Sequence, residues 1–192
     1  MIVGAHMQSY FSTAALVCAV VLTSSVAATA QSSTSEWSVG YSYLRDPGSS
    51  ILAATADDDS FTLGWAAGGA RHVWRAIWLA GEVAGHYKRR TTLDEDVSLS
   101  YHAFLAGPRA AVTVGGVTEF VQVLAGAVHG RASAFGTTVT VTDLGLQPGG
   151  GIDYALNRRL AARLQLDYRW IRGSDGRNAV NQFKAVAGFV FH

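Results

Sequence analysis

The chain has 192 residues, of which 49% are hydrophobic and only 15% are charged, and its formal net charge is +1. Average proteins carry about 25% charged residues, so this chain is poor in charge. The balance near zero gives no reason to expect a nucleic-acid partner. After residue 30 no apolar run approaches the ~20 residues that a spanning helix requires, which excludes a helical membrane domain there.

Residues 1–30 have the pattern of a secretory signal peptide. An apolar core covers 14–22, and the small residues Ala-Thr-Ala end at Ala30, as a signal peptidase requires. We expect cleavage after Ala30 and a single mature domain over 31–192. Cys18 is the only cysteine and lies within this segment, so the mature chain has no disulfide and no cysteine metal ligand.

Eight segments of the mature chain alternate apolar side chains with polar or small ones. Successive side chains of a strand point to opposite faces, so each segment predicts a strand with one apolar face. The clearest is 160–170, where Leu, Ala, Tyr and Trp hold the even positions and Arg163, Gln165, Asp167 and Arg169 hold odd ones. The predicted strands are 37–43, 61–68, 77–88, 98–105, 119–129, 144–154, 160–170 and 183–191.

Three of these strands carry particular expectations. The apolar face of 61–68 begins with Phe61. In 98–105 the apolar face holds Leu99, Tyr101, Ala103 and Leu105, which assigns His102 to the polar face. In 144–154, Pro148 lacks a ladder donor, so we expect a bulge or a local break there.

The connectors alternate in length, as in an up-and-down barrel with both termini on one side. Short turns on one side and longer loops on the other are typical of outer-membrane barrels. The predicted long connectors are 45–60, 89–96, 130–142 and 173–181, and the short ones are 71–73 and 157–159. The segment 109–117, which contains Gly115-Gly116, is an exception because it is long where a short turn is expected.

The alternation also fits a soluble, lipocalin-like barrel with its apolar face inside. The aromatic residues favour an apolar face that meets lipid. Tyrosines and tryptophans lie near segment ends on that face, as in the interfacial girdles of membrane barrels. The chain also closes with aromatics at Phe189 and Phe191. The aromatics assigned to the girdles are Trp37, Tyr43, Trp65, Tyr87, Tyr101, Tyr154, Tyr168 and Trp170.

Several strings resemble the porin-like outer-membrane β-barrel domain family, which is similar to the OmpA and OmpX type of eight-stranded barrel. The resemblance covers most of the mature chain and is strongest from Phe104 onward. It implies an all-β, eight-stranded, antiparallel transmembrane barrel in the cell outer membrane, and it transfers no catalytic residue. The strings are 104–109 (FLAGPR), 119–126 (EFVQVLAG), 149–154 (GGGIDY), 163–170 (RLQLDYRW) and 188–191 (GFVF).

Charged and polar residues on the non-lipid faces predict a network inside the barrel. They could form an ion path or a set of mutually neutralising pairs, and the narrow interior of eight strands favours the second. The tight turn at Asn157-Arg158-Arg159 sets a register in which Asp153 faces Arg163 across the hairpin. The predicted network comprises Glu82, His102, Asp153, Arg163, Asp167, Arg169 and Lys184.

The leading functional prediction is a non-catalytic outer-membrane protein for envelope integrity, surface contact or very limited solute passage. One alternative is a barrel hydrolase of lipid or peptide using His86, His102, Glu82 and Ser100, although no nucleophile motif is present. The two histidines also lack a third metal ligand. The other alternative is a soluble periplasmic binding barrel.

We expect no cofactor and no metal, a monomer, and both termini in the periplasm. The expected partners are outer-membrane lipid and lipopolysaccharide, with recognition of the C-terminal aromatic strand by the barrel assembly machinery. Three charged clusters lie in the predicted outer loops or beside them, where they could bind cations or lipid phosphates. These clusters are 57–59 (DDD), 88–90 (KRR) and 94–96 (DED).

Overall fold

The computed structural model describes residues 34–45, 60–92, 95–134, 137–173 and 179–192, without the side chains of 90–92, 95–96 and 134. The chain divides into two units, Met1–Ala30 and Gln31–His192, and all described residues belong to the second. The signal-peptide prediction therefore lies outside the described residues. Among the described residues, no helix is long and apolar enough to cross a membrane.

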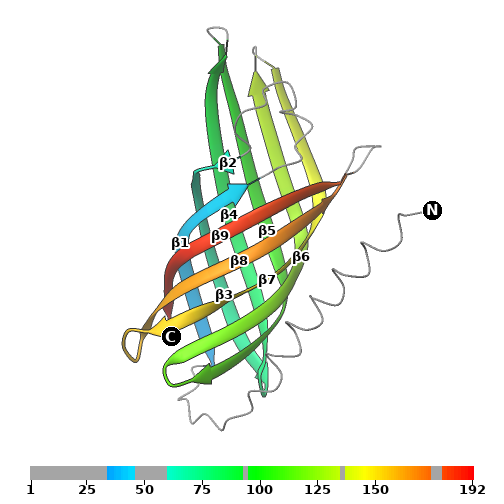
Figure 1. Cartoon of the computed structure of the whole chain (residues 1–192). Coiled ribbons are helices and arrows are strands. Elements are labelled where there is room, and N and C mark those ends of the chain that lie inside the picture. The colour runs from blue at the N-terminus through cyan, green and yellow to red at the C-terminus, as the bar shows by residue number, and fades with distance from the viewer. Residues whose placement is uncertain (1–33, 46–59, 93–94, 135–136, 174–178) are drawn as a thin grey trace, which may run out of the picture. The chain divides into compact units, whose positions relative to one another are not determined.

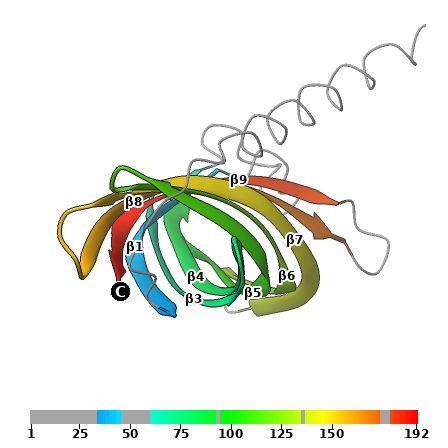
Figure 2. The ribbon, with the colours of Figure 1, turned by 90° about the horizontal axis from the view of Figure 1, so that it is seen from below.

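The described residues form one closed antiparallel barrel (Figures 1 and 2). Neighbours in the chain pair with each other, and β1 pairs with β9 from Trp37–Phe191 to Arg45–Phe183, which closes the sheet. Because β2 and β3 are separated by Thr62 alone, they act as one strand, and the predicted eight-stranded barrel is confirmed. The strands are β1 (Ser35–Arg45), β2 (Ser60–Phe61), β3 (Leu63–Trp74), β4 (Ile77–Thr92), β5 (Glu95–Val114), β6 (Val117–Ala134), β7 (Thr137–Ala155), β8 (Leu160–Arg172) and β9 (Val180–Phe191).

A one-residue bulge at Thr62 reverses the prediction for Phe61. Tyr41 pairs with Trp65, but Leu44 pairs with Phe61, so β2–β3 contains one residue more than β1 over this stretch. The Tyr41 hydroxyl donates to the Thr62 carbonyl at the bulge. An extra residue exchanges the two faces of a strand. Phe61 therefore points inward and is 1% exposed, rather than lying on the apolar outer face.

The apolar faces point outward, which is the reverse of a soluble barrel. Leu164 and Leu166 are each 60% exposed, whereas Gln165 between them is buried. Exposing such an apolar surface to water would cost about 25 cal/mol of free energy per Å². A contiguous apolar belt of this kind is typical of a surface that faces lipid. The alternative of a soluble barrel with an apolar interior is therefore wrong. Of the aromatics assigned to the girdles, Tyr101 is the exception, because it points inward and packs edge-on against Phe61.

The faces of β5 are opposite to those predicted. Leu99, Ala103 and Leu105 are buried inside the barrel, and Phe104 is 55% exposed on the outer face. The inner wall in this region is itself apolar, since Leu105 packs with Leu124 and other small or aliphatic residues. Both faces of β5 therefore carry apolar side chains, and alternation alone does not tell them apart.

Three tight turns, which join β3 to β4, β5 to β6 and β7 to β8, lie at one end of the barrel, which we call the turn end. One is Arg75–Ala76, where Arg75 has a φ of 50°. Another is Gly115-Gly116, with φ of 57° and 87°. Two consecutive positive φ values are typical of a two-residue hairpin turn and suit glycine. The predicted long connector 109–117 is thus mostly strand, and the predicted turn at 71–73 lies a few residues later.

At the opposite end, the loop end, β4–β7 are longer than predicted and project beyond β8 and β9 (Figure 1). The predicted long connectors 89–96 and 130–142 are therefore mostly strand, and Lys88 and Arg89 lie in β4. The acidic cluster 57–59 and the side chains of 94–96 lie outside the described residues.

Pro148 is accommodated without a bulge. The pairs of β7 with β8 are interrupted at 147–148 but resume in the same register, from Leu146–Trp170 to Gly149–Asp167. The expected local break is present, whereas the expected bulge is not. The chain is closely packed at Gly151, because a Cβ there would lie 2.8 Å from the Phe120 ring.

The outward face of β8 provides a test of which face meets lipid. Leu164→Arg is expected to lower the free energy of unfolding by ~2–4 kcal/mol, because it places a charge near the middle of the apolar belt. Gln165→Arg is expected to cost less, since Glu82 and Asp167 already accept hydrogen bonds from Gln165. Urea unfolding of the barrel in lipid vesicles, followed by tryptophan fluorescence, measures both. The opposite order would mean that the lipid face has been misassigned.

Candidate functional site: the polar network of the lumen

The lumen contains as many buried bases as buried acids. Charges removed from water need partners of opposite sign, because an isolated buried charge is strongly destabilising. Four of each sign are buried among the described residues, so the interior is neutral without external ions. The acids are Glu36, Glu82, Asp153 and Asp167, and the bases are Arg109, Arg163, Arg169 and Lys184.

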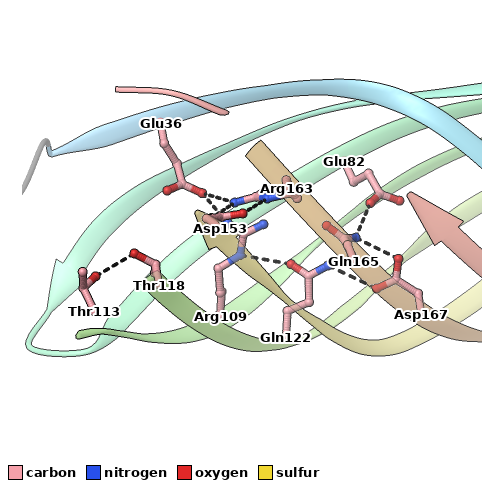
Figure 3. A network of polar contacts seen from close by, with 10 residues as sticks. All are labelled: Glu36, Glu82, Arg109, Thr113, Thr118, Gln122, Asp153, Arg163, Gln165 and Asp167. Carbon is pink, nitrogen blue, oxygen red and sulfur yellow. Dashed lines mark hydrogen bonds and ion pairs between the residues drawn. The ribbon is translucent and has the colours of Figure 1, made fainter. Parts of the chain in front are cut away.

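The group nearest the turn end is built around Arg163 (Figure 3). Its Nε and Nη2 donate to the two carboxylate oxygens of Asp153, each at 2.7 Å. Nη2 also donates to Glu36 Oε1 at 2.9 Å, and Arg109 forms an ion pair with the same oxygen. Asp153 and Arg163 are direct partners across the β7–β8 hairpin, so the predicted pairing is confirmed.

Phe120 holds the two arginines of this group in place. Its ring lies 4.5 Å from the Arg109 guanidinium carbon and 4.6 Å from that of Arg163. Such cation–π contacts are worth about 2 kcal/mol where the cation is desolvated. The aromatic face therefore limits repulsion between two neighbouring cations, whose negative partners are Glu36 and Asp153.

The second group surrounds Lys184. Its Nζ pairs with Asp167 Oδ2 at 3.0 Å and also with Glu82. Gln165 Nε2 donates to Glu82 Oε2 at 3.0 Å and to Asp167 Oδ2 at 2.8 Å. Gln122 joins the two groups, because its Oε1 accepts from Arg109 Nε and its Nε2 donates to Asp167 Oδ1.

Arg169 and His86 lie further towards the loop end. Arg169 is fully buried and donates from Nε to Gln147 Oε1 at 2.8 Å, and Gln147 in turn donates to Glu82. Its Nη2 has no hydrogen-bond partner among the described residues. His86 Nε2 lies 2.8 Å from Ser42 Oγ, and its Nδ1 is likewise without a described partner.

Little open space remains between these side chains. A cavity of about 20 Å³ lies between the two groups, lined by Glu82, Arg109, Gln122, Arg163 and Gln165 among others. That volume accommodates about one water molecule. Between these two groups, the described lumen therefore has no space for a larger solute.

Six of the seven residues predicted for the network lie in the lumen, and His102 does not. His102 Nε2 lies 3.0 Å from the Tyr87 hydroxyl, on the outer face of the barrel. It pairs across strands with Gly85, whose neighbours Ala84 and His86 point inward. The assignment of His102 to the lumen is wrong because the two faces of β5 were exchanged.

The predicted network did not include Glu36, Arg109 or four glutamines of the lumen, although the alternation of 160–170 places Gln165 on the polar face. Glu36 has the same parity as Ser38, so extending the alternation of β1 by one step would have found it. Arg109 follows Pro108 and was assigned to a connector, and reversing the faces of β5 would have placed it inside. The glutamines are Gln122, Gln147, Gln165 and Gln182.

The structure does not bring together the residues of the hydrolase that the sequence analysis considered. His86 points into the lumen and His102 points outward, so they share neither a catalytic centre nor a metal. The serine near His86 is Ser42 rather than Ser100, and both members of this pair are fully buried. No described acid accepts a hydrogen bond from His86 Nδ1 to orient the ring.

Because Arg163 has two negative partners, its substitution should cost more stability than the substitution of Asp153. Arg163→Gln is expected to cost about 3–5 kcal/mol, the usual result of breaking a buried ion pair. Asp153→Asn should cost less, because Arg163 keeps its bond to Glu36. The matched control, Arg158→Gln in an exposed turn, should stay within about 0.5 kcal/mol. Urea titrations in detergent measure all three, and equal small losses at 153 and 163 would show that the network adds little to stability.

No family model and no curated protein matches this chain. Among solved structures, Neisserial surface protein A has a TM-score of 0.65 and 13% identity, over 83% of this chain and 97% of that one. The attachment invasion locus protein Ail of Yersinia pestis, in complex with the heparin analogue sucrose octasulfate, has a TM-score of 0.55 and 20% identity, over 82% and 97%. The outer membrane protein OprG from Pseudomonas aeruginosa has a TM-score of 0.54 and 12% identity, over 82% and 94%. This chain therefore has the fold of the eight-stranded outer-membrane β-barrels, as its resemblance to the porin-like barrel family implied.

Proposed function

We propose that the protein is a non-catalytic, monomeric barrel of the outer membrane that serves envelope integrity or surface contact, with at most very limited solute passage. The observation that carries the proposal is an apolar outer face around a lumen filled by four acids and four bases. An ion-paired interior of this kind supports the barrel wall and obstructs diffusion along its axis.

The proposed orientation in the membrane is supported by the difference between the two ends of the barrel. Ser35 and Phe191 both lie at the turn end, where Trp37 pairs with Phe191. Short turns of outer-membrane barrels face the periplasm, so the proposed orientation has both strand termini there. The aromatic outer face of β9, with Phe183, Phe189 and Phe191 exposed, is the proposed signal for barrel assembly.

Lipopolysaccharide is the proposed lipid partner at the loop end. Arg89 on β4 and Arg131 on β6 are exposed and point outward, beyond Tyr87. His102 and His129 lie on the same face. In the proposed orientation these groups lie level with the headgroups of the outer leaflet, where guanidinium groups bind phosphate.

Two of the solved structures that share the fold have descriptions that refer to the surface or to attachment. One is described as a surface protein and the other as an attachment invasion locus protein. Their identity to this chain, 13% and 20%, supports the fold alone. The surface role of this chain therefore depends on the residues of its own loop end.

The double variant Arg89→Gln/Arg131→Gln tests the lipid partner. It should weaken binding of the refolded barrel to vesicles that contain lipopolysaccharide, and the binding that remains should depend less on salt. The control Arg158→Gln/Arg159→Gln removes the same charge from the turn end and should leave binding unchanged. Flotation of vesicles at two salt concentrations measures both variants. Equal losses in the two would remove the case for a specific site at the loop end.

Conductance in planar bilayers tests the closed lumen. The native barrel is expected to conduct poorly. Glu82→Ala/Lys184→Ala removes a buried pair without changing net charge and should raise the conductance several-fold by opening the gap between the two groups. The mobility shift of the barrel on heating checks that the variant is folded. A large native conductance that the variant leaves unchanged would contradict the proposal.

A further inference from the structure

A groove of about 1090 Å³ hollows the outer face of the barrel across β3–β6. Small residues that pair with one another from strand to strand form its floor, and large exposed side chains border it. The floor consists of Gly69, Gly81, Ala106 and Ala125. The bordering side chains include Trp37, Leu79 and Phe104.

The groove lies on the lipid-facing side of the wall. Ala106 and Ala125 are themselves exposed, and Gly81 has the same parity as the exposed residue Leu79. Each floor residue is next in sequence to a residue that points inward and is at most 5% exposed, so packed side chains close the lumen side. These inward residues are Ala70, Ala80, Leu105 and Leu124.

The two glycines of the floor contribute in different ways. Above Gly81 there is open space, because a Cβ there would have only the Leu105 carbonyl oxygen within 4 Å, at 3.8 Å. Above Gly69 lies the indole of Trp37, since a Cβ at Gly69 would lie 3.0 Å from Cζ3 of that ring. The result is a channel with its floor at the level of the backbone and an aromatic wall at one end.

The strand tilt carries the groove from the turn end towards the middle of the apolar belt. Trp37 lies two residues from the start of β1, Gly69 lies five residues from the end of β3, and Ala106 lies eight residues from the end of β5. All three strand ends are at the turn end. Because each residue of a strand adds about 3.4 Å, the floor climbs steadily away from that end. An extended hydrocarbon chain that entered at the turn end would follow this line.

A positive charge stands where the groove reaches the turn end. Arg71 is exposed two residues beyond Gly69, on the same face, and its cross-strand partner is Ser35. Arg71 forms no ion pair with a described acid. The two acids whose backbone borders the groove, Glu36 and Glu82, turn their side chains into the lumen, where bases neutralise them. A guanidinium beside a hydroxyl is well suited to bind a phosphate.

We propose that this groove binds one anionic phospholipid, with its phosphate at Arg71 and Ser35 and one acyl chain along Gly69, Gly81 and Ala106. The positive end and the apolar channel are continuous, which matches a molecule with a phosphate at one end and hydrocarbon behind it. This site is separate from the proposed lipopolysaccharide contact at the loop end. In the proposed orientation the lipid belongs to the inner leaflet, but the site itself does not depend on that orientation.

The test uses native mass spectrometry of the full chain refolded in detergent. The probe is palmitoyl-oleoyl-phosphatidylglycerol, and its control is the zwitterionic phosphatidylcholine with the same two chains. We expect one phosphatidylglycerol to stay bound to each barrel when the detergent is stripped. The fraction of barrels that retains phosphatidylcholine should be about threefold lower or less, because its headgroup carries a positive charge beside the phosphate.

Two matched pairs of variants test the channel and the headgroup contact separately. Ala106→Leu fills the channel, whereas Ala187→Leu adds the same volume to the exposed outer face of β9. Arg71→Gln removes the headgroup contact, whereas Arg158→Gln removes the same charge from an exposed turn. The first member of each pair should lower the retained fraction about fivefold or more. The second should change it less than about twofold. The mobility shift on heating verifies that all four variants are folded.

Equal retention of phosphatidylglycerol by Ala106→Leu and Ala187→Leu would overturn the proposal. A loss in Arg71→Gln without a loss in Ala106→Leu would also overturn it, because a charge alone would then attract the headgroup as it would free phosphate. A dimer that Ala106→Leu abolishes and that excludes phosphatidylglycerol would assign the groove to a second copy instead. None of these outcomes involves the loop end, so failure here would leave the proposed function standing.

Discussion

Closure of the sheet gives every strand of this barrel two neighbours, and most other features of the structure follow from it. Hydrocarbon offers no water to satisfy backbone N–H and C=O groups, so each must find a partner within the protein. The ladder between β1 and β9 supplies these partners to the first and last strands. Once the sheet is closed, its outer face meets lipid and must be apolar, while its inner face encloses a narrow space. The inversion relative to a soluble barrel, seen at Leu164 and Gln165, follows from this geometry.

The narrow interior determines how charge is arranged within it. Arg163 pairs with two acids at once, the Phe120 ring contacts two cations, and Gln122 links the two ion-paired groups. Glutamine suits this role because its amide both donates and accepts. It can therefore connect an arginine to a carboxylate without adding charge. The result is a neutral interior whose members come from strands far apart in the sequence.

The fold and part of the site were predictable from the sequence because their determinants are local. The period of β8 shows directly which residues face lipid, and a tight turn near Arg158 determines that Asp153 faces Arg163. The errors have non-local causes. The inward position of Phe61 depends on a bulge that appears only when β2–β3 is aligned with β1. The outward position of His102 depends on an apolar inner wall, which makes both faces of β5 look alike.

The two ends of the barrel differ because the constraint on backbone pairing applies only within the membrane. At the turn end, hairpins such as Gly115-Gly116 join strands with two residues, which leaves little backbone beyond the sheet. At the loop end, four strands continue past β8 into a region where water can satisfy an unpaired edge. Strand segments without a neighbouring strand among the described residues are therefore tolerated at the loop end, whereas hydrocarbon would exclude them. Because the polar network leaves space for only about one water molecule between its two groups, the proposed contact with other molecules is assigned to this projecting sheet rather than to the interior.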